Sequence, residues 1–221
     1  MRAKSIATLL AFIVCILTIA LLTWGGCGIG FGNNGGDGGN VGPDSVQGTI
    51  TSISNVSSTS GIEVQATDSA NTRTDTTDNN GFFQIQGFFS GSSLKLAFVD
   101  PNNNNQVLAV TSVTIFPGIQ INLGNITITD GNVTLSGNIS VTFDGDISTN
   151  NCSQNAGNNA GTIVVTAGNT DVIVQVLSST TIVDSNNNTR NCGDLLSGGT
   201  VTVAGDLLMG NTVQANRIEL H

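Results

Sequence analysis

Apolar and polar residues alternate over short stretches between residues 45 and 129, which is the pattern of half-buried β-strands. Segments such as SNVSSTS, DTTDNNG and DPNNNN separate these stretches, and their Asn, Asp, Ser and Gly residues are typical of tight turns. The pattern predicts strands at 46–53, 61–67, 82–86, 94–99, 107–115 and 119–128.

A second set of alternating stretches runs from about residue 131 to residue 220. The turn signal Thr129-Asp130-Gly131-Asn132 precedes it, so we expect two β domains, at 45–129 and 130–221. Neither shows the helical patterns that βαβ units need, which favours an all-β fold: a β-sandwich followed by a small β-barrel. The predicted strands of the second domain are 133–143, 161–167, 170–177, 180–183, 200–205 and 211–220.

The N-terminus has a different pattern. Arg2 and Lys4 precede an uncharged, strongly apolar stretch at 6–24, which is the order of a bacterial export signal. At about 20 residues this stretch also reaches the length of a membrane-spanning helix. We therefore expect residues 1–26 to form a helix that is a signal peptide or an uncleaved membrane anchor.

The residues after this helix suggest a lipid anchor. The segment Trp24-Gly25-Gly26-Cys27-Gly28 resembles the lipobox of bacterial lipoproteins, which implies that Cys27 is lipidated and begins the mature chain. Gly28 is not the aspartate that this family uses for inner-membrane retention, so the resemblance implies the outer membrane. The alternative is an inner-membrane anchor with a periplasmic body. Residues 27–44 are rich in Gly and Asn and predict a flexible tether.

The charge of the chain excludes some classes of partner, and its cysteines indicate the compartment in which it folds. The net charge is −9, and nucleic acids and anionic lipid surfaces need clustered basic residues, so neither is an expected partner. Cys152 and Cys192 are the two cysteines of the exported body, lie in turn-like segments, and are predicted to form a disulfide in an oxidising compartment. Since His221 is the only histidine, a zinc site is not expected.

Each half also resembles a known family. The segments VQGTI (46–50), GIEV (61–64) and TDTTDNNGFF (74–83) resemble the carboxypeptidase regulatory-like, transthyretin-related β-sandwich. That resemblance implies an accessory or attachment module without catalytic residues. The second half is similar to short barrel-like domains of unknown function in secreted bacterial proteins, which are related to oligomer-binding folds. The matching segments are LSGNI (135–139), VIVQV (172–176), STTI (179–182), LLSGGTVTVAG (195–205) and VQANRI (213–218).

Candidate chemistry is sparse. Calcium is the one cofactor that the sequence suggests: Asp75, Asp78 and Asn80 crowd one segment and offer oxygen ligands. A plain turn, stabilised by these side chains through their own backbone, is the favoured interpretation of the same residues. Asp144 and Asp146 alternate around Gly145, which predicts a polar hairpin tip; the alternative is an acid pair. We therefore carry two hypotheses: a noncatalytic envelope lipoprotein that binds a protein or polysaccharide or gives structural support, and a secreted glycan-directed hydrolase of the acid-pair type.

Overall fold

The computed structural model describes residues 44–87, 89–155 and 158–221. The predicted N-terminal helix (1–26), Cys27 and the predicted tether up to residue 43 lie outside the described residues. Within the described ranges, no helix is long and apolar enough to cross a bilayer.

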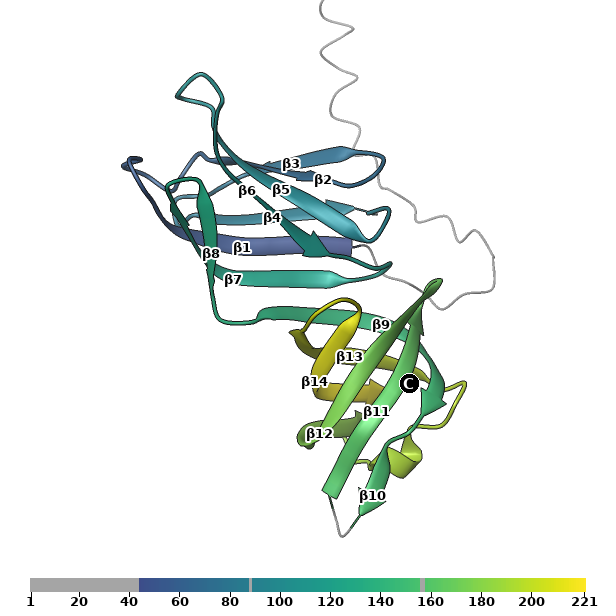
Figure 1. The fold of residues 1–221 in the computed structure, drawn as a ribbon. Helices are drawn as coiled ribbons and strands as arrows, with labels where there is room; N and C mark the ends of the chain where they lie inside the picture. The colour runs from purple at the N-terminus through teal and green to yellow at the C-terminus, as the bar shows by residue number, and fades with distance from the viewer. Residues whose placement is uncertain (1–43, 88, 156–157) are drawn as a thin grey trace, which may run out of the picture. The chain divides into compact units, whose positions relative to one another are not determined.

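The described chain is built from β-strands (Figure 1), as the sequence predicts. Its one helical element in the described ranges is the short 3-10 turn η1 (Cys192–Asp194). The strands are β1 (Asp44–Ile53), β2 (Glu63–Thr67), β3 (Thr72–Thr76), β4 (Phe82–Gly87), β5 (Ser93–Asp100), β6 (Gln106–Thr114), β7 (Gln120–Thr129), β8 (Asn132–Ser136), β9 (Ile139–Asn150), β10 (Ser153–Asn155), β11 (Asn158–Ala167), β12 (Thr170–Asp184), β13 (Thr200–Leu207) and β14 (Thr212–Leu220).

The first eight strands form two layers. One is the four-stranded sheet β3-β2-β5-β6, and the other contains β4, β1 and β7, with β8 paired to β7. Alternation along β1, β4 and β5 directs apolar side chains inward, and Phe83 of β4 meets Phe98 of β5 edge to face at 6.2 Å. Both rings are fully buried, so the two sheets pack face to face around one apolar core.

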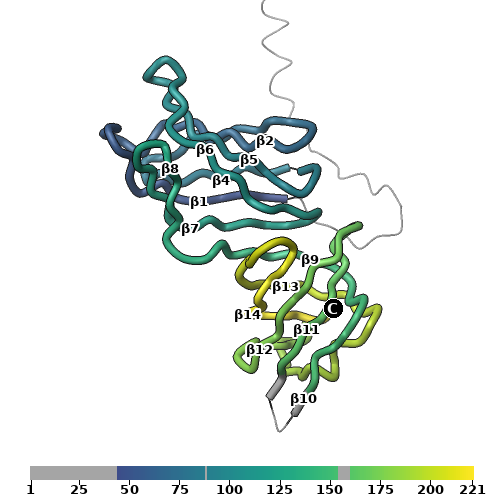
Figure 2. Tube along the Cα trace, viewed as in Figure 1, coloured from purple at the N-terminus to yellow at the C-terminus, as the bar shows by residue number. Residues whose placement is uncertain are grey.

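The last strands close into a small barrel in the order β9-β13-β14-β12-β11, and β11 pairs with β9 to complete the ring (Figure 2). All neighbours are antiparallel except β12 and β14, which are parallel. This is a five-stranded Greek-key barrel, the architecture of oligomer-binding folds. Its interior is filled by alternating apolar side chains, among them Phe143, Val165, Val174, Val203 and Ile218.

Strand β12 corrects one sequence prediction. The two predicted strands at 170–177 and 180–183 are a single strand whose register against β14 shifts between Val176 and Thr181. The hydroxyl of Thr180 accepts the N–H of Leu177 (2.9 Å) and donates to the carbonyl of Ala215 (2.7 Å). Ser178 and Ser179 are therefore part of a β-bulge and not of a turn between strands.

The predicted boundary at Thr129 to Asn132 also differs. The turn is present, but it joins β7 to β8, with Thr129 opposite Asn132. The next break is at Gly137 (φ 104°), which divides the single strand predicted at 133–143 into β8 and β9. Moreover, β9 pairs with β7 through Gln120 and Thr142, so a continuous sheet connects the two predicted strand sets.

Asp44 begins β1, where the sequence predicted the end of the tether. It is 2% exposed, and its carboxylate accepts the N–H groups of Gly118 and Phe89. Burial raises the pKa of Asp44 above its ordinary value, although these N–H groups and Arg73 act in the opposite direction. Because the pKa of Asp44 is raised in the folded state, its contribution to stability is fully present below the ordinary pKa of Asp. That contribution is lost as the pH rises through the raised pKa of the folded state.

Asp184 makes the opposite pH-dependent contribution. Its carboxylate accepts the N–H groups of Asn186 and Asn188, each at 2.9 Å, and the Arg190 guanidinium at 2.6 Å. The hydrogen bonds from Asn188 contribute most to holding the pKa of Asp184 well below its usual range. Its contribution to stability is therefore present above the ordinary pKa of about 4 and is lost as pH falls below it.

We expect Asp184→Asn to lower stability at neutral pH, and we expect its difference from the natural protein to shrink as the pH falls below the ordinary pKa of about 4. The measurement is urea unfolding of both proteins from neutral pH to about pH 2, a range that extends below the ordinary pKa of Asp. A difference between the two curves that stays constant with pH would contradict this assignment.

Candidate ligand-binding cavity

A cavity of about 600 Å³ opens at one end of the two-layer unit. Three connections that are distant in sequence form it: the segment after β1, the turn between β5 and β6, and the turn between β7 and β8. Loops held by a rigid scaffold are common places for binding residues. The lining residues are Ile53, Ser54, Asn55, Val56, Ser57, Asp100, Asn103, Gln106, Val107, Leu108, Ile128, Asp130 and Gly131.

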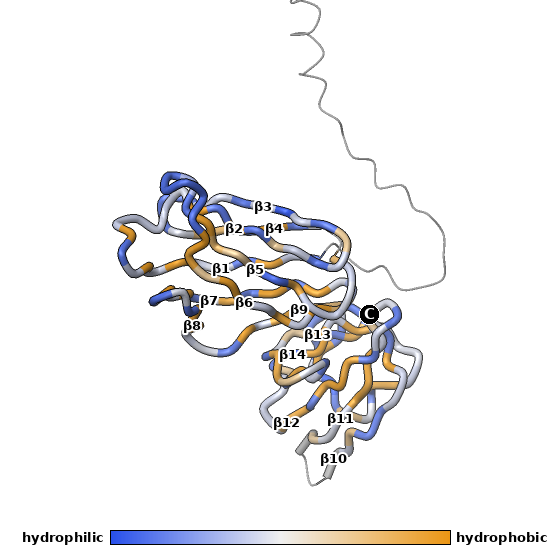
Figure 3. Tube along the Cα trace, turned by 45° about the horizontal axis from the view of Figure 1, so that its top comes forward, coloured by the Kyte–Doolittle hydropathy of each residue, from blue (hydrophilic) through white to orange (hydrophobic). Residues whose placement is uncertain are grey.

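The backbone at this end turns tightly because its residues tolerate the left-handed conformation. Asn55 has φ 64° and Asp130 has φ 50°, and Gly131 follows with φ 80°. In the β5–β6 turn the carboxylate of Asp100 accepts the N–H of Asn102 (2.9 Å), and the N–H of Gln106 donates to the carbonyl of Asn103 (2.9 Å). The strands that these turns join alternate between hydrophobic and hydrophilic residues along the chain (Figure 3).

Ser54 connects two of the three walls. Its hydroxyl donates to the carbonyl of Ile128 (3.2 Å) and accepts the N–H of Asp130 (3.0 Å), while its own N–H also donates to Ile128 (2.9 Å). Ile53 and Ile128 are buried beneath the cavity. Two of the three walls are therefore hydrogen-bonded to each other above the apolar core.

Several lining side chains are available to a ligand. Within the described ranges, the side chains of Asn55, Ser57 and Asp130 make no hydrogen bond or ion pair. The side-chain oxygen of Gln106 accepts from the Asn103 amide, which leaves the Gln106 amide nitrogen as a donor. Amide, hydroxyl and carboxylate groups can together recognise a polar ligand through both donors and acceptors.

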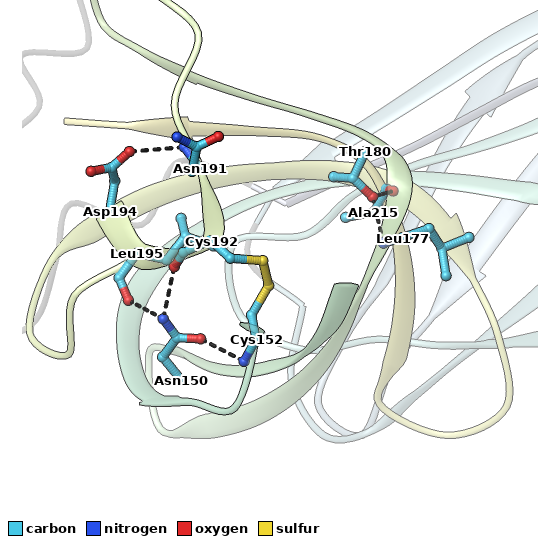
Figure 4. The surroundings of a disulfide bond; sticks show 9 residues. All are labelled: Asn150, Cys152, Leu177, Thr180, Asn191, Cys192, Asp194, Leu195 and Ala215. Carbon is cyan, nitrogen blue, oxygen red and sulfur yellow. Dashed lines mark hydrogen bonds between the residues drawn. A yellow bond between two sulfur atoms is a disulfide. The ribbon is translucent and has the colours of Figure 1, made fainter. Parts of the chain in front are cut away.

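The predicted disulfide between Cys152 and Cys192 is confirmed, with 5.5 Å between the Cα atoms (Figure 4). The side chain of Asn150 connects the same two segments. Its Nδ2 donates to the carbonyls of Cys192 (3.0 Å) and Leu195 (2.8 Å), and its Oδ1 accepts the N–H of Cys152 (2.8 Å). The disulfide thus fastens the β9–β10 connection to η1, which lies in the connection between β12 and β13.

The residues proposed for calcium use their oxygens locally. Asp75 accepts the N–H groups of Thr76 (2.8 Å) and Gln84 (2.7 Å), and Asp78 accepts those of Asn80 (2.7 Å) and Phe82 (2.9 Å). In the described part of the chain, no group of three or more His, Cys, Asp or Glu residues is placed to hold a metal ion. Calcium binding by Asp75, Asp78 and Asn80 stays a prediction beside their observed role in the β3–β4 connection.

The proposed acid pair lies within β9 and not at a hairpin tip. Asp144 accepts the hydroxyl of Thr202 (2.5 Å), and Asp146 accepts that of Thr200 (2.9 Å), so each carboxylate has a threonine partner on β13. A different pair, Asp100 and Asp130, lines the cavity. The hydrolase hypothesis for Asp144 and Asp146 stays a prediction.

Sequence reasoning missed the cavity residues. The segments SNVSSTS, DPNNNN and TDGN each predict a separate turn, and nothing in a single sequence indicates that three turns share one end of a fold. The only local signal is the repeated Asn and Asp content, which is equally typical of turns without a ligand.

Comparisons with known proteins do not assign a family. No protein-family model matches the chain, and no curated protein matches it. A solved structure, a 9R-lipoxygenase from Cyanothece PCC8801, aligns with 39% of this chain and 16% of its own at 17% identity, with a TM-score of 0.27. At that TM-score the likeness carries no argument about fold or activity.

Proposed function

We propose that this chain is a noncatalytic lipoprotein of the cell envelope, anchored at the outer membrane, that displays two β modules for binding. The observation that carries the proposal is the cavity at the β5–β6 end of the two-layer unit, in which polar side chains without intramolecular partners stand over an apolar floor. The export pattern at 1–26 and Cys27 support the anchored location.

We further propose that the two-layer unit is a carboxypeptidase regulatory-like sandwich. The TDNNGFF motif supports this because its residues make the β3–β4 connection: Asp78 accepts two backbone N–H groups, and Gly81 adopts φ 78°. A Cβ at Gly81 would stand 2.2 Å from the carbonyl oxygen of Ile50, so glycine is required there. The Greek-key barrel likewise supports kinship of the second half with the secreted barrel-like domains.

Anchoring by lipid makes a direct prediction about Cys27. We expect Cys27→Ala to move the protein from the membrane fraction to the soluble fraction, since the tether sequence after it has almost no apolar surface. The measurement is membrane fractionation with labelling by a palmitate analogue. Cys15→Ala is the matched control, because Cys15 belongs to the predicted helix and should be neutral. Membrane retention of the Cys27 variant with an intact N-terminus would instead establish residues 6–24 as a transmembrane anchor.

A further inference from the structure

The charges of the cavity limit the ligand it can hold. Asp100 and Asp130 line the cavity, and its lining residues include no Lys, Arg or His. A phosphate, sulfate or uronate would approach two carboxylates without a lining cation to neutralise it, and like charges repel. The charges of the lining therefore favour a neutral ligand over an anionic one.

The hydrogen-bonding groups indicate what the ligand must offer. Asn55 and Ser57 present both donors and acceptors, Asp130 presents acceptors, and the Gln106 amide nitrogen presents a donor. Polar groups that become buried without a partner destabilise a complex by about 1–3 kcal/mol each. A ligand rich in hydroxyl groups can satisfy both the donors and the acceptors of the cavity, because each hydroxyl both donates and accepts a hydrogen bond.

The apolar lining residues can contact the C–H groups of a ligand that is rich in hydroxyl groups. Val56, Leu108 and Val107 contribute aliphatic surface, and Val107 is 56% exposed. Sugar rings carry C–H faces that need apolar contact between their hydroxyl groups. A volume of about 600 Å³ lies within the range of pockets that hold small ligands, so it can accept a short oligosaccharide.

The walls are also fixed before a ligand arrives. Ser54 joins the β1–β2 segment to β7 and to Asp130, and the turn after β5 is closed by Asp100 and Asn103. Such preorganisation reduces the conformational entropy that the loops lose on binding.

From these features we infer that the cavity binds a neutral saccharide. The inference rests on the proposed function, since it names the ligand class of the binding module. Asn55, Gln106 and Asp130 are the recognition residues, and the two carboxylates exclude anionic sugars.

The experiment uses full-length protein in detergent and equilibrium dialysis with labelled trisaccharides. The probes are neutral oligomers of glucose, mannose and N-acetylglucosamine, together with a uronic-acid trisaccharide. Asn55→Gly removes one recognition side chain, and glycine tolerates the φ of 64° at this position. Gln106→Ala removes a second recognition side chain. Asn104→Gly is the matched control, because Asn104 also has a positive φ (52°) and lies in the β5–β6 turn but is not itself a lining residue.

We expect saturable binding of at least one neutral probe and none of the uronic-acid probe. Asn55→Gly and Gln106→Ala should each weaken binding about fivefold, the effect of losing one hydrogen bond, whereas Asn104→Gly should change it by less than about twofold. Asp130→Asn keeps the shape and suits the positive φ, and it should allow measurable binding of the uronic-acid probe.

Three results would overturn the inference: no neutral probe binds, the cavity variants bind as the natural protein does, or the uronic-acid probe binds as well as the neutral ones. The last result, if sensitive to Asn55→Gly, would refute the ligand class but leave the cavity as a binding site. Failure of the lipoprotein proposal appears separately, in the fractionation of Cys27→Ala.

Discussion

Removing the disulfide should lower the free energy of unfolding by about 4 kcal/mol, the value that the chain-entropy model gives for a separation of 40 residues. The bond constrains the unfolded chain between Cys152 and Cys192, and in the folded state it fastens the β9–β10 connection to η1. Since domains are typically stable by about 5–15 kcal/mol, we expect the barrel to become marginal.

The measurement is guanidinium unfolding of the natural protein with and without reductant, beside the double variant Cys152→Ala/Cys192→Ala. Reductant should shift the natural protein to the midpoint of the double variant and leave that variant unchanged. Asn150 still hydrogen-bonds to both segments after reduction, so local structure there should persist. An unfolding midpoint that does not respond to reductant would contradict a stabilising role for the bond.

The second large effect is expected at Asp44. Asp44→Ala removes the acceptor of the Gly118 and Phe89 N–H groups, both of which lie in connections between strands. Buried donors left without partners destabilise by about 1–3 kcal/mol each, and we expect a total of about 3 kcal/mol. The result would be a loosened start of β1, which is paired on both sides by β4 and β7.

Asp171→Ala is the control for this variant, because Asp171 is an exposed strand residue that only accepts the hydroxyl of Thr166 (2.7 Å). It should change stability by less than about 1 kcal/mol. If urea unfolding of Asp44→Ala matched that of Asp171→Ala, the hydrogen bonds that the buried carboxylate of Asp44 accepts would not stabilise the fold.

Local alternation predicted most strands well, because an inward apolar residue at every second position is a property of the sequence alone. It failed where that signal was missing or interrupted. Strand β3 reads TRTDT and has no apolar residue, yet it pairs with β2 at the edge of its sheet. Ser178 and Ser179 resemble a turn but belong to the bulge in β12, where Thr180 supplies the missing hydrogen bonds.

The pairing of strands that are distant in sequence was harder to predict. The resemblance to barrel-like domains implied closure, but only the structure identifies β11 with β9 as the closing pair and β9 with β7 as the link between the strand sets. The disulfide could be predicted because two cysteines allow one pairing in the exported body. The cavity could not, because Asn55, Gln106 and Asp130 come together only through the sheet order.

The central claim is that the cavity binds a glycan and does not cleave it. Its most direct test is to incubate the full-length protein with the neutral trisaccharide that binds best, and then to recover the ligand and analyse it by mass spectrometry. The account predicts that the bound trisaccharide is recovered intact from the natural protein and that binding weakens in Asn55→Gly. Release of mono- or disaccharide by the natural protein, lost in Asp100→Asn or Asp130→Asn, would contradict it and establish an acid-pair hydrolase.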